Sequence, residues 1–545
     1  MPQGQVVELS HPSKLGAGKT MIWFSIVLVA AYLCRGVVLC CIVPPMEMWD
    51  EYQHVARIEY LHETGRSPVY QHADVPVSVM RQVILYPQAY WAEKQTIGAG
   101  GELYPQFWQN NERPKFRPGP TPSLYEAQQS PLYYWLMRPI FNAAGGVNHS
   151  AKCVSVLRLV NVGFGAAALA VLLAWAARAC RQRRYAMVIG LWAGSIPLLL
   201  LDCARVANDA LALLLAVIVI AWALALEGRR LRWHAAGLGV VAGLGILAKA
   251  TDLALIPFVL VCLAAVGWRM KAKWSDFGIA AAIFLLIAAT LISPIVVDSY
   301  QHFGVPFPMQ EAIVNHEHGV KISALLAYLR WDHWWYWQTV YRQWFLDGGL
   351  WVGGWSLIPP PPHFIDWYEY LLWLSFWGWP VAWLVRREKF GASSVFRSAW
   401  LVPAIVVLSL LVLAEMSVHS VESVISWGNS GTLSWYAAPA LPWAAGVLAA
   451  SALAWRTTRL RYWPAFLMPA FFLFVEFFNE FFQMVGIYSQ AGLSLAAFRR
   501  LATLHPQWLS WRTLTVAAGL GFVLLAGAFG LCLAEMCRRD ETYPA

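Results

Sequence analysis

The sequence predicts an all-α polytopic membrane protein with about twelve transmembrane helices and two long loops on one side of the membrane. Hydrophobic residues make up 59% of the 545 positions, and charged residues only 13%. A soluble chain usually carries about 25% charged residues. Apolar runs of roughly 17–25 residues, the length that crosses a hydrocarbon core, recur along the chain.

These apolar runs define the expected spans. The first run is too long for the apolar core of a signal peptide, and no small-residue cleavage site follows it, so it is counted as a span. The expected spans are residues 21–43, 154–177, 186–201, 209–226, 235–248, 252–267, 277–297, 367–385, 398–414, 433–454, 463–487 and 513–535.

Basic residues set the expected orientation. Clusters of Lys and Arg fall in alternate loops, for example at 178–185, 227–234 and 456–461. Such loops stay in the cytoplasm, so both termini are expected inside. The formal charge of +9 mainly reflects these loops. No soluble segment combines a basic patch with stacking aromatics, so no nucleic-acid partner is expected.

Two long loops then lie outside the cytoplasm, at 44–152 and 298–366, and both are expected to carry short interfacial helices. They divide the chain into an N-terminal transmembrane module (1–297), the second loop, and C-terminal transmembrane helices (367–545). The second loop joins an aromatic segment to a Gly-rich stretch at 345–358, which indicates either a lid or a rigid aromatic belt at the membrane surface.

Adjacent carboxylates follow the first span, in the segment "MEMWDEYQHVARIEYLHE". A helix over residues 48–62 would place Asp50, His54 and Arg57 on one face, with Glu51 turned about 100° away. In one interpretation the two acids simply favour a helix N-terminus. In the other, one of them is a general base whose neighbours on the helix orient it.

Polar residues at further outer span ends favour the second interpretation, because charge at membrane depth is costly. Two of these residues have a structural alternative to a functional role. Arg205 could serve simply as the ion-pair partner of Asp209, and Lys249 could simply extend its amine to the membrane interface. Arg35, inside the first span, is expected to form an internal ion pair. The outer candidates are Gln128, Gln129, Tyr133, Arg205, Asn208, Asp209 and Lys249.

Five segments in this order resemble the GT-C superfamily of membrane glycosyltransferases, in particular a bacterial branch with a Pro…Asp-Glu-x-x-His motif after the first span. They are "PPMEMWDEYQH", "EAQQSPLYY", "NDALALLLA", "LAKATDLALIP" and "GGWSLIPP". The resemblance implies a GT-C-like fold in the bacterial inner (plasma) membrane. It also implies transfer of a sugar, with inversion, from a polyprenyl-phosphate carrier to an acceptor outside the cytoplasm. Asp50 would be the base, with Glu51 as second candidate.

The chemistry agrees with that implication. A phosphomonoester has a second pKa near 6, so a polyprenyl phosphate can leave without a general acid. The site then needs a base for the acceptor hydroxyl and cations for the phosphate, which Arg205 and Lys249 could supply. His54, Arg57, Gln128, Gln129, Tyr133, Asn208 and Asp209 complete the expected substrate-binding set. No cofactor is required, and a divalent metal is possible but has no complete ligand set.

Two other functions are weighed against the transferase. A transporter or lipid flippase should show two related halves, which the sequence lacks. A polysaccharide polymerase or ligase acting on lipid-linked oligosaccharide would rely on Arg and His instead of a first-loop acid. The expected partners are therefore a polyprenyl-phosphate-linked sugar, membrane lipids, and an acceptor that is a glycan, a lipid or a protein.

Overall fold

The computed structural model describes residues 14–89, 100–227, 230–386, 392–457 and 462–537, apart from 111, 113, 270, 272, 329, 331–332, 351–352 and 355–357. Within these residues every regular element is helical, and extended segments pair only at isolated bridges. The predicted all-α class is confirmed.

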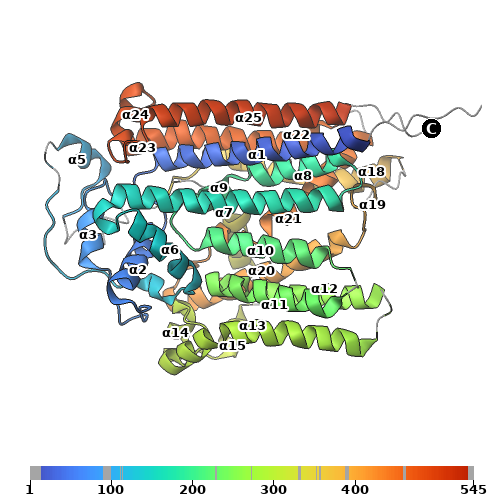
Figure 1. Ribbon diagram of the computed structural model, residues 1–545, viewed down its shortest axis with the longest axis horizontal. Coiled ribbons are helices and arrows are strands. Elements are labelled where there is room, and N and C mark those ends of the chain that lie inside the picture. Colours follow the sequence, from blue (N-terminus) through green and yellow to red (C-terminus); the bar gives the residue numbers. More distant parts are fainter. Residues whose placement is uncertain are drawn as a thin grey trace, which may run out of the picture.

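Long apolar helices lie side by side and form the body of the molecule (Figure 1). Among the described residues, eight are long and apolar enough to cross a membrane. They are α1 (Lys14–Ile42), α7 (Ser150–Ala179), α11 (Leu231–Ala248), η4 (Ala250–Ala254) continued through α12 (Leu255–Arg269), α13 (Trp274–Phe303), α20 (Leu401–Trp427), α22 (Trp463–Phe477) continued through η9 (Phe478–Met484) and α23 (Val485–Ser489), and α25 (Trp511–Cys537).

A bent pair makes a ninth candidate span. Helices α8 (Arg183–Ser195) and α9 (Pro197–Cys203) meet at an angle of 57°. Ile196 between them has an extended backbone, because the proline that follows it disfavours the helical conformation there.

The predicted count of twelve spans is not confirmed. Helix α10 (Asp209–Leu224) has 16 residues, about 24 Å at 1.5 Å per residue, against a hydrocarbon core of about 30 Å. The expected spans at 367–385 and 433–454 become shorter helices, α17 (Pro362–Phe376), α18 (Gly378–Arg386) and α21 (Leu441–Ala452). Hydropathy alone cannot distinguish such pieces from whole spans, because it does not register where the helix breaks.

The short helices expected in the two long loops are present, and those that Figure 1 labels gather at one end of the bundle. Helix α1 begins and α25 ends at the opposite end. The first loop contains α2 (Glu51–Thr64), α3 (Val77–Val83), α5 (Tyr104–Gln109) and α6 (Leu132–Ala143), and the second contains α14 (Gln310–Glu317), α15 (Ile322–Ala327) and α16 (Trp334–Arg342).

An ion pair inside the bundle joins α1 to α22. The guanidinium of Arg35 donates to both carboxylate oxygens of Glu476, and both side chains are buried. Removing one partner of such a pair would leave an uncompensated charge inside the bundle. The expectation that Arg35 is an internal ion-pair partner is confirmed.

The Gly-rich part of the second loop packs against the first loop and the C-terminal helices. Asn479 Nδ2 donates to the carbonyl oxygen of Leu350 at 3.3 Å. A Cβ atom at Gly354 would lie 2.2 Å from the carbonyl oxygen of Glu47, so only glycine permits this approach. Part of the segment predicted to act as a lid, at 351–352 and 355–357, lies outside the described residues.

Candidate active site

Asp50 precedes helix α2 and does not lie within it. The sequence predicts a helix over residues 48–62 that carries Asp50 on the face of His54 and Arg57. In the structure α2 begins at Glu51, and Asp50 has a left-handed backbone with φ 55° and ψ 4°. The helical spacing therefore does not reach Asp50, and this part of the prediction is wrong. A left-handed backbone costs about 1–2 kcal/mol, and such strain clusters at functional positions.

Tyr125 holds the Asp50 side chain in place. Its hydroxyl donates a 2.5 Å hydrogen bond to Oδ1 of Asp50. Residues 41–49 are all buried, whereas Asp50 is only half-buried. Burial raises the pKa of the Asp50 carboxyl, against the opposing effects of the Tyr125 hydrogen bond and the charge of Arg205. A carboxylate with a raised pKa is a stronger base.

Glu51 is enclosed, and both of its carboxylate oxygens are occupied. Arg158 of α7 donates from Nε to Oε1 at 2.7 Å and from Nη2 to Oε2 at 2.6 Å. The backbone N–H groups of Met46 and Val206 donate to the same carboxylate at 2.9 and 3.0 Å. These bonds tie the turn before Asp50 to the bundle, so the geometry gives Glu51 a positioning role.

Two cations meet at Asp209, close to the Asp50 turn. Arg205 Nη2 donates to Asp209 Oδ2 at 2.8 Å, which confirms that these two residues pair. Lys249 forms an ion pair with the other oxygen of Asp209. Arg205 also donates to Asp202 and, from Nη1, to the carbonyl oxygen of Trp49 at 3.0 Å. Since Trp49 directly precedes Asp50, this bond fixes the acid relative to the cations.

His54 and Arg57 lie behind Asp50, against α6. Nδ1 of His54 is 2.7 Å from the hydroxyl of Tyr134, and Arg57 Nη1 donates to the carbonyl oxygen of Glu126 at 2.6 Å. Arg57 also stacks over the Tyr134 ring, 4.0 Å from its centroid. Burial lowers the pKa of His54 well below its ordinary value. Both side chains are enclosed and pack the first loop together.

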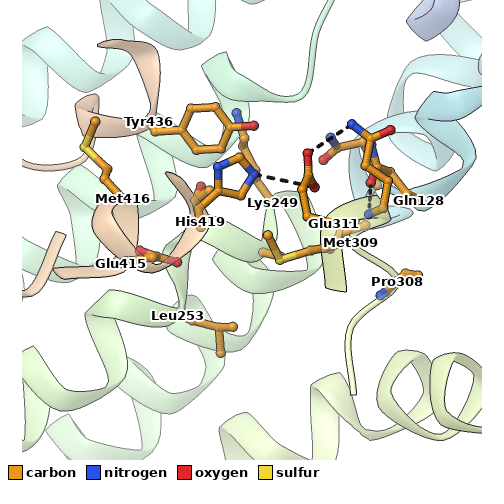
Figure 2. Close-up of a pocket in the computed structure, with 15 residues that line it drawn as sticks. Gln128, Lys249, Leu253, Pro308, Met309, Glu311, Glu415, Met416, His419 and Tyr436 are labelled. Atoms are coloured by element: carbon orange, nitrogen blue, oxygen red, sulfur yellow. Dashed lines mark hydrogen bonds and ion pairs between the residues drawn. The ribbon is translucent and has the colours of Figure 1, made fainter. Parts of the chain in front are cut away.

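A cavity of about 90 Å³ lies beside this network (Figure 2). Of the expected residues, Gln128, Gln129 and Lys249 line it. Oε1 of Gln128 accepts a 2.6 Å hydrogen bond from the backbone N–H of Gln310. The Asn208 amide donates to Oε1 of Gln129 at 3.2 Å and so orients it without lining the cavity. The structure thus brings part of the expected set to one space.

Tyr133 lies elsewhere. Its side chain is fully buried, and its hydroxyl accepts a 3.0 Å hydrogen bond from the amide of Asn161 on α7. This contact holds α6 against the bundle. Among the described residues, no three His, Cys, Asp or Glu side chains are grouped so that they could hold a metal ion.

Sequence reasoning missed a second wall of the cavity, formed by Glu311 of α14, His419 of α20 and Tyr436. Figure 2 shows Glu311 and His419 facing each other, with Lys249 and Tyr436 beside them. Nε2 of His419 is 3.7 Å from Oε2 of Glu311. Nζ of Lys249 lies 5.0 Å from the Tyr436 ring centroid. Nothing in the local sequence pattern connects these residues, because the segments meet only in the folded chain.

Tyr125 and Glu126 were also missed, although they stand just before Gln128 and Gln129. Burial and the charge of Asp50 raise the pKa of Glu126 to about 8. Its Oε2 has no hydrogen-bond partner among the described residues and lies 3.7 Å from Nδ1 of His54. The sequence did offer a signal for Glu126, because this acid stands two residues before the expected pair Gln128 and Gln129.

No protein-family model matches the chain, and no curated protein matches its sequence. Solved structures align with the chain at low sequence identity and low TM-score. ArnT from Cupriavidus metallidurans, bound to undecaprenyl phosphate, is 12% identical with a TM-score of 0.43, and the alignment covers 95% of this chain and 76% of that one. The oligosaccharyltransferase AglB from Archaeoglobus fulgidus, in complex with an inhibitory peptide and a dolichol-phosphate, is 11% identical with a TM-score of 0.38, over 94% and 56% of the two chains. Likeness at this level does not transfer an activity.

Proposed function

We propose that the chain is an inverting glycosyltransferase that moves a sugar from a polyprenyl-phosphate carrier to an acceptor outside the cytoplasm. One observation carries the proposal. Asp50 is a half-buried carboxylate, held by Tyr125 in a left-handed turn at one end of a membrane bundle, beside the cations Arg205 and Lys249. A base next to cations at that depth suits a reaction on a lipid-linked sugar phosphate.

In the proposed reaction the acceptor hydroxyl attacks the anomeric carbon while Asp50 takes its proton. The bond between that carbon and the carrier phosphate oxygen breaks, and its electron pair leaves with the phosphate. Since attack and departure occur on opposite faces of the sugar, the configuration inverts. The phosphate leaves as an anion and needs no general acid.

The two cations differ in what they could do for that phosphate. The Nε, Nη1 and Nη2 atoms of Arg205 already donate to Asp202, Asp209 and Trp49. Lys249 lines the cavity and makes its ion pair with Asp209 alone among the described residues. Lys249 is therefore the proposed direct phosphate contact. Arg205 contributes its charge and fixes the Asp50 turn.

The cavity side chains suit a polyhydroxylated ring. The amides of Gln128 and Gln129 and the carboxylate of Glu311 can exchange hydrogen bonds with hydroxyl groups. The Tyr436 ring beside Lys249 offers an apolar face. Closure of 345–358 over this space, which would exclude water, remains a prediction.

The donor is tested by mass spectrometry of lipids that co-purify with the protein. The proposal predicts a polyprenyl-phosphate sugar that is retained by the native protein and depleted in Lys249→Gln. Its matched control is Lys152→Gln, which removes an exposed lysine at the same end of the bundle. If the purified protein instead moved intact lipid between the two leaflets of a vesicle membrane and transferred no sugar to any acceptor, the protein would be a flippase.

A further inference from the structure

A second cavity opens at the end of the bundle opposite to Asp50. Its volume is about 720 Å³, and it lies where α7, α10 and α12 end and where α20 begins. Figure 1 shows these helix ends on the side where α25 ends. This is the end that the basic loops predict to be cytoplasmic. The cavity is therefore separate from the candidate active site.

Three arginines line this cavity, with Glu227 as its one acidic lining residue in the described part of the chain. Arg178 stands in the last turn of α7 and Arg269 ends α12. Neither makes a hydrogen bond or ion pair with another described residue. Arg397 donates from Nε to the carbonyl oxygen of Cys180 at 3.1 Å, and its outer nitrogens make no other bond within the described residues. Unused guanidinium donors are matched by phosphate oxygens.

The dipoles of α7 and α12 explain why arginines stand at the C-terminal ends of these helices. They do not explain why the arginines line a cavity. The remaining walls of that space are apolar and aromatic, from Val171, Ile218 and Leu224 and from the rings of Trp175, Trp222 and Trp400. Tryptophan is enriched at the membrane–water interface, where its ring is apolar and its N–H is polar. A ligand of this cavity needs an anionic head for the arginines and apolar chains for the walls.

We propose that this cavity binds an anionic glycerophospholipid of the leaflet predicted to be cytoplasmic. Its phosphodiester lies among Arg178, Arg269 and Arg397, and its acyl chains lie along the apolar wall. Basic pockets between transmembrane helices on this side of a membrane are suited to anionic headgroups. Three cations against one acid favour a net anionic lipid over a zwitterionic one. The site does not depend on the proposed transferase activity.

Native mass spectrometry tests the proposal directly. Delipidated full-length protein is incubated with equal amounts of dioleoyl phosphatidylglycerol and dioleoyl phosphatidylcholine, which share their acyl chains and differ in net charge. The wild type is expected to retain phosphatidylglycerol about tenfold more than phosphatidylcholine, and the R178Q/R269Q variant to lose most of that preference. The single variants Arg178→Gln and Arg269→Gln should each lose part of it, so the test does not depend on the folding of the double variant.

Arg232→Gln is the matched control. Arg232 stands in the first turn of α11 at the same end, is exposed, pairs with Asp276 and does not line the cavity. This variant should keep the wild-type preference. Equal loss in Arg232→Gln would mean that general surface charge attracts the lipid, and an unchanged preference in the single and double variants would place the lipid elsewhere. Displacement of phosphatidylglycerol by inorganic phosphate would show that the cavity binds small anions and does not require a lipid. Each of these results would overturn the proposal.

Discussion

Glu51 and Arg158 form a buried ion pair with two hydrogen bonds, at 2.7 and 2.6 Å, between the first loop and α7. The pair lies one residue from Asp50, whose carboxylate is half-buried and bonded by Tyr125. Adjacent acids in the sequence therefore have different surroundings. The enclosed Glu51 anchors the turn, and the more exposed Asp50 is the proposed base.

Glu51→Gln should destabilise the protein, because it leaves Arg158 buried without a counter-charge. The expected loss is about 3–5 kcal/mol in the free energy of unfolding, measured by chemical unfolding in detergent. Replacing both partners, in Glu51→Gln/Arg158→Met, should recover part of that loss. If Glu51→Gln unfolded like the wild type and lost only turnover, Glu51 would be a reacting group and not an anchor.

Tyr125→Phe should move the acidic limb of the pH–rate profile to higher pH. The Tyr125 hydrogen bond lowers the pKa of Asp50 against the effect of burial, so its removal raises that pKa further. At acidic pH the variant should then be several-fold slower than the wild type, while the rates converge at alkaline pH. A uniform loss at every pH would show that Tyr125 acts only through geometry.

Glu126→Gln should change how stability depends on pH. The pKa of Glu126 is raised to about 8 by burial and by the charge of Asp50. The folded protein therefore keeps a proton that the unfolded chain loses above a pH of about 4.5. The free energy of unfolding should therefore decrease as the pH rises from about 4.5 to about 8, by at most about 1.4 kcal/mol per pH unit.

Melting temperatures measured from pH 5 to 8 check this dependence. Glu126→Gln should show a flatter curve than the wild type over that window and the same behaviour above it. The Asp74→Asn variant, which changes an exposed acid in the same loop, should follow the wild type. Parallel curves for Glu126→Gln and the wild type would refute the raised pKa.

Lys249→Gln should weaken binding of the lipid-linked donor more than binding of the acceptor. Loss of a charge-assisted bond to the carrier phosphate costs about 1.5–3 kcal/mol, or roughly a 10- to 150-fold rise in Kd. Arg205→Gln should also weaken donor binding, and it should lower stability more, because it removes the ion pairs to both Asp202 and Asp209, whereas Lys249→Gln removes only one ion pair. Titration of each variant with donor, alongside Lys152→Gln, separates these effects. Unchanged donor affinity in both variants would exclude the phosphate role.

The sequence was informative where single residues or local runs decide the structure. Apolar runs predicted the helices, and the burial of a charge inside the first span predicted that Arg35 has an ionic partner. Local reasoning failed at Asp50, because a left-handed residue interrupts the helical spacing on which the prediction rested. The hydrogen bond between Tyr125 and Asp50 could not be predicted locally either, because it joins two segments that meet only in the folded chain.

The rate of sugar transfer by Asp50→Asn tests the central claim most directly. This change keeps the shape of the side chain and removes its basicity, so turnover should fall by on the order of 100-fold or more, while donor binding and melting temperature stay close to the wild type. Asp74→Asn, the exposed acid of the same loop, should transfer at the wild-type rate. Normal turnover by a folded Asp50→Asn variant would contradict the assignment of Asp50 as the base.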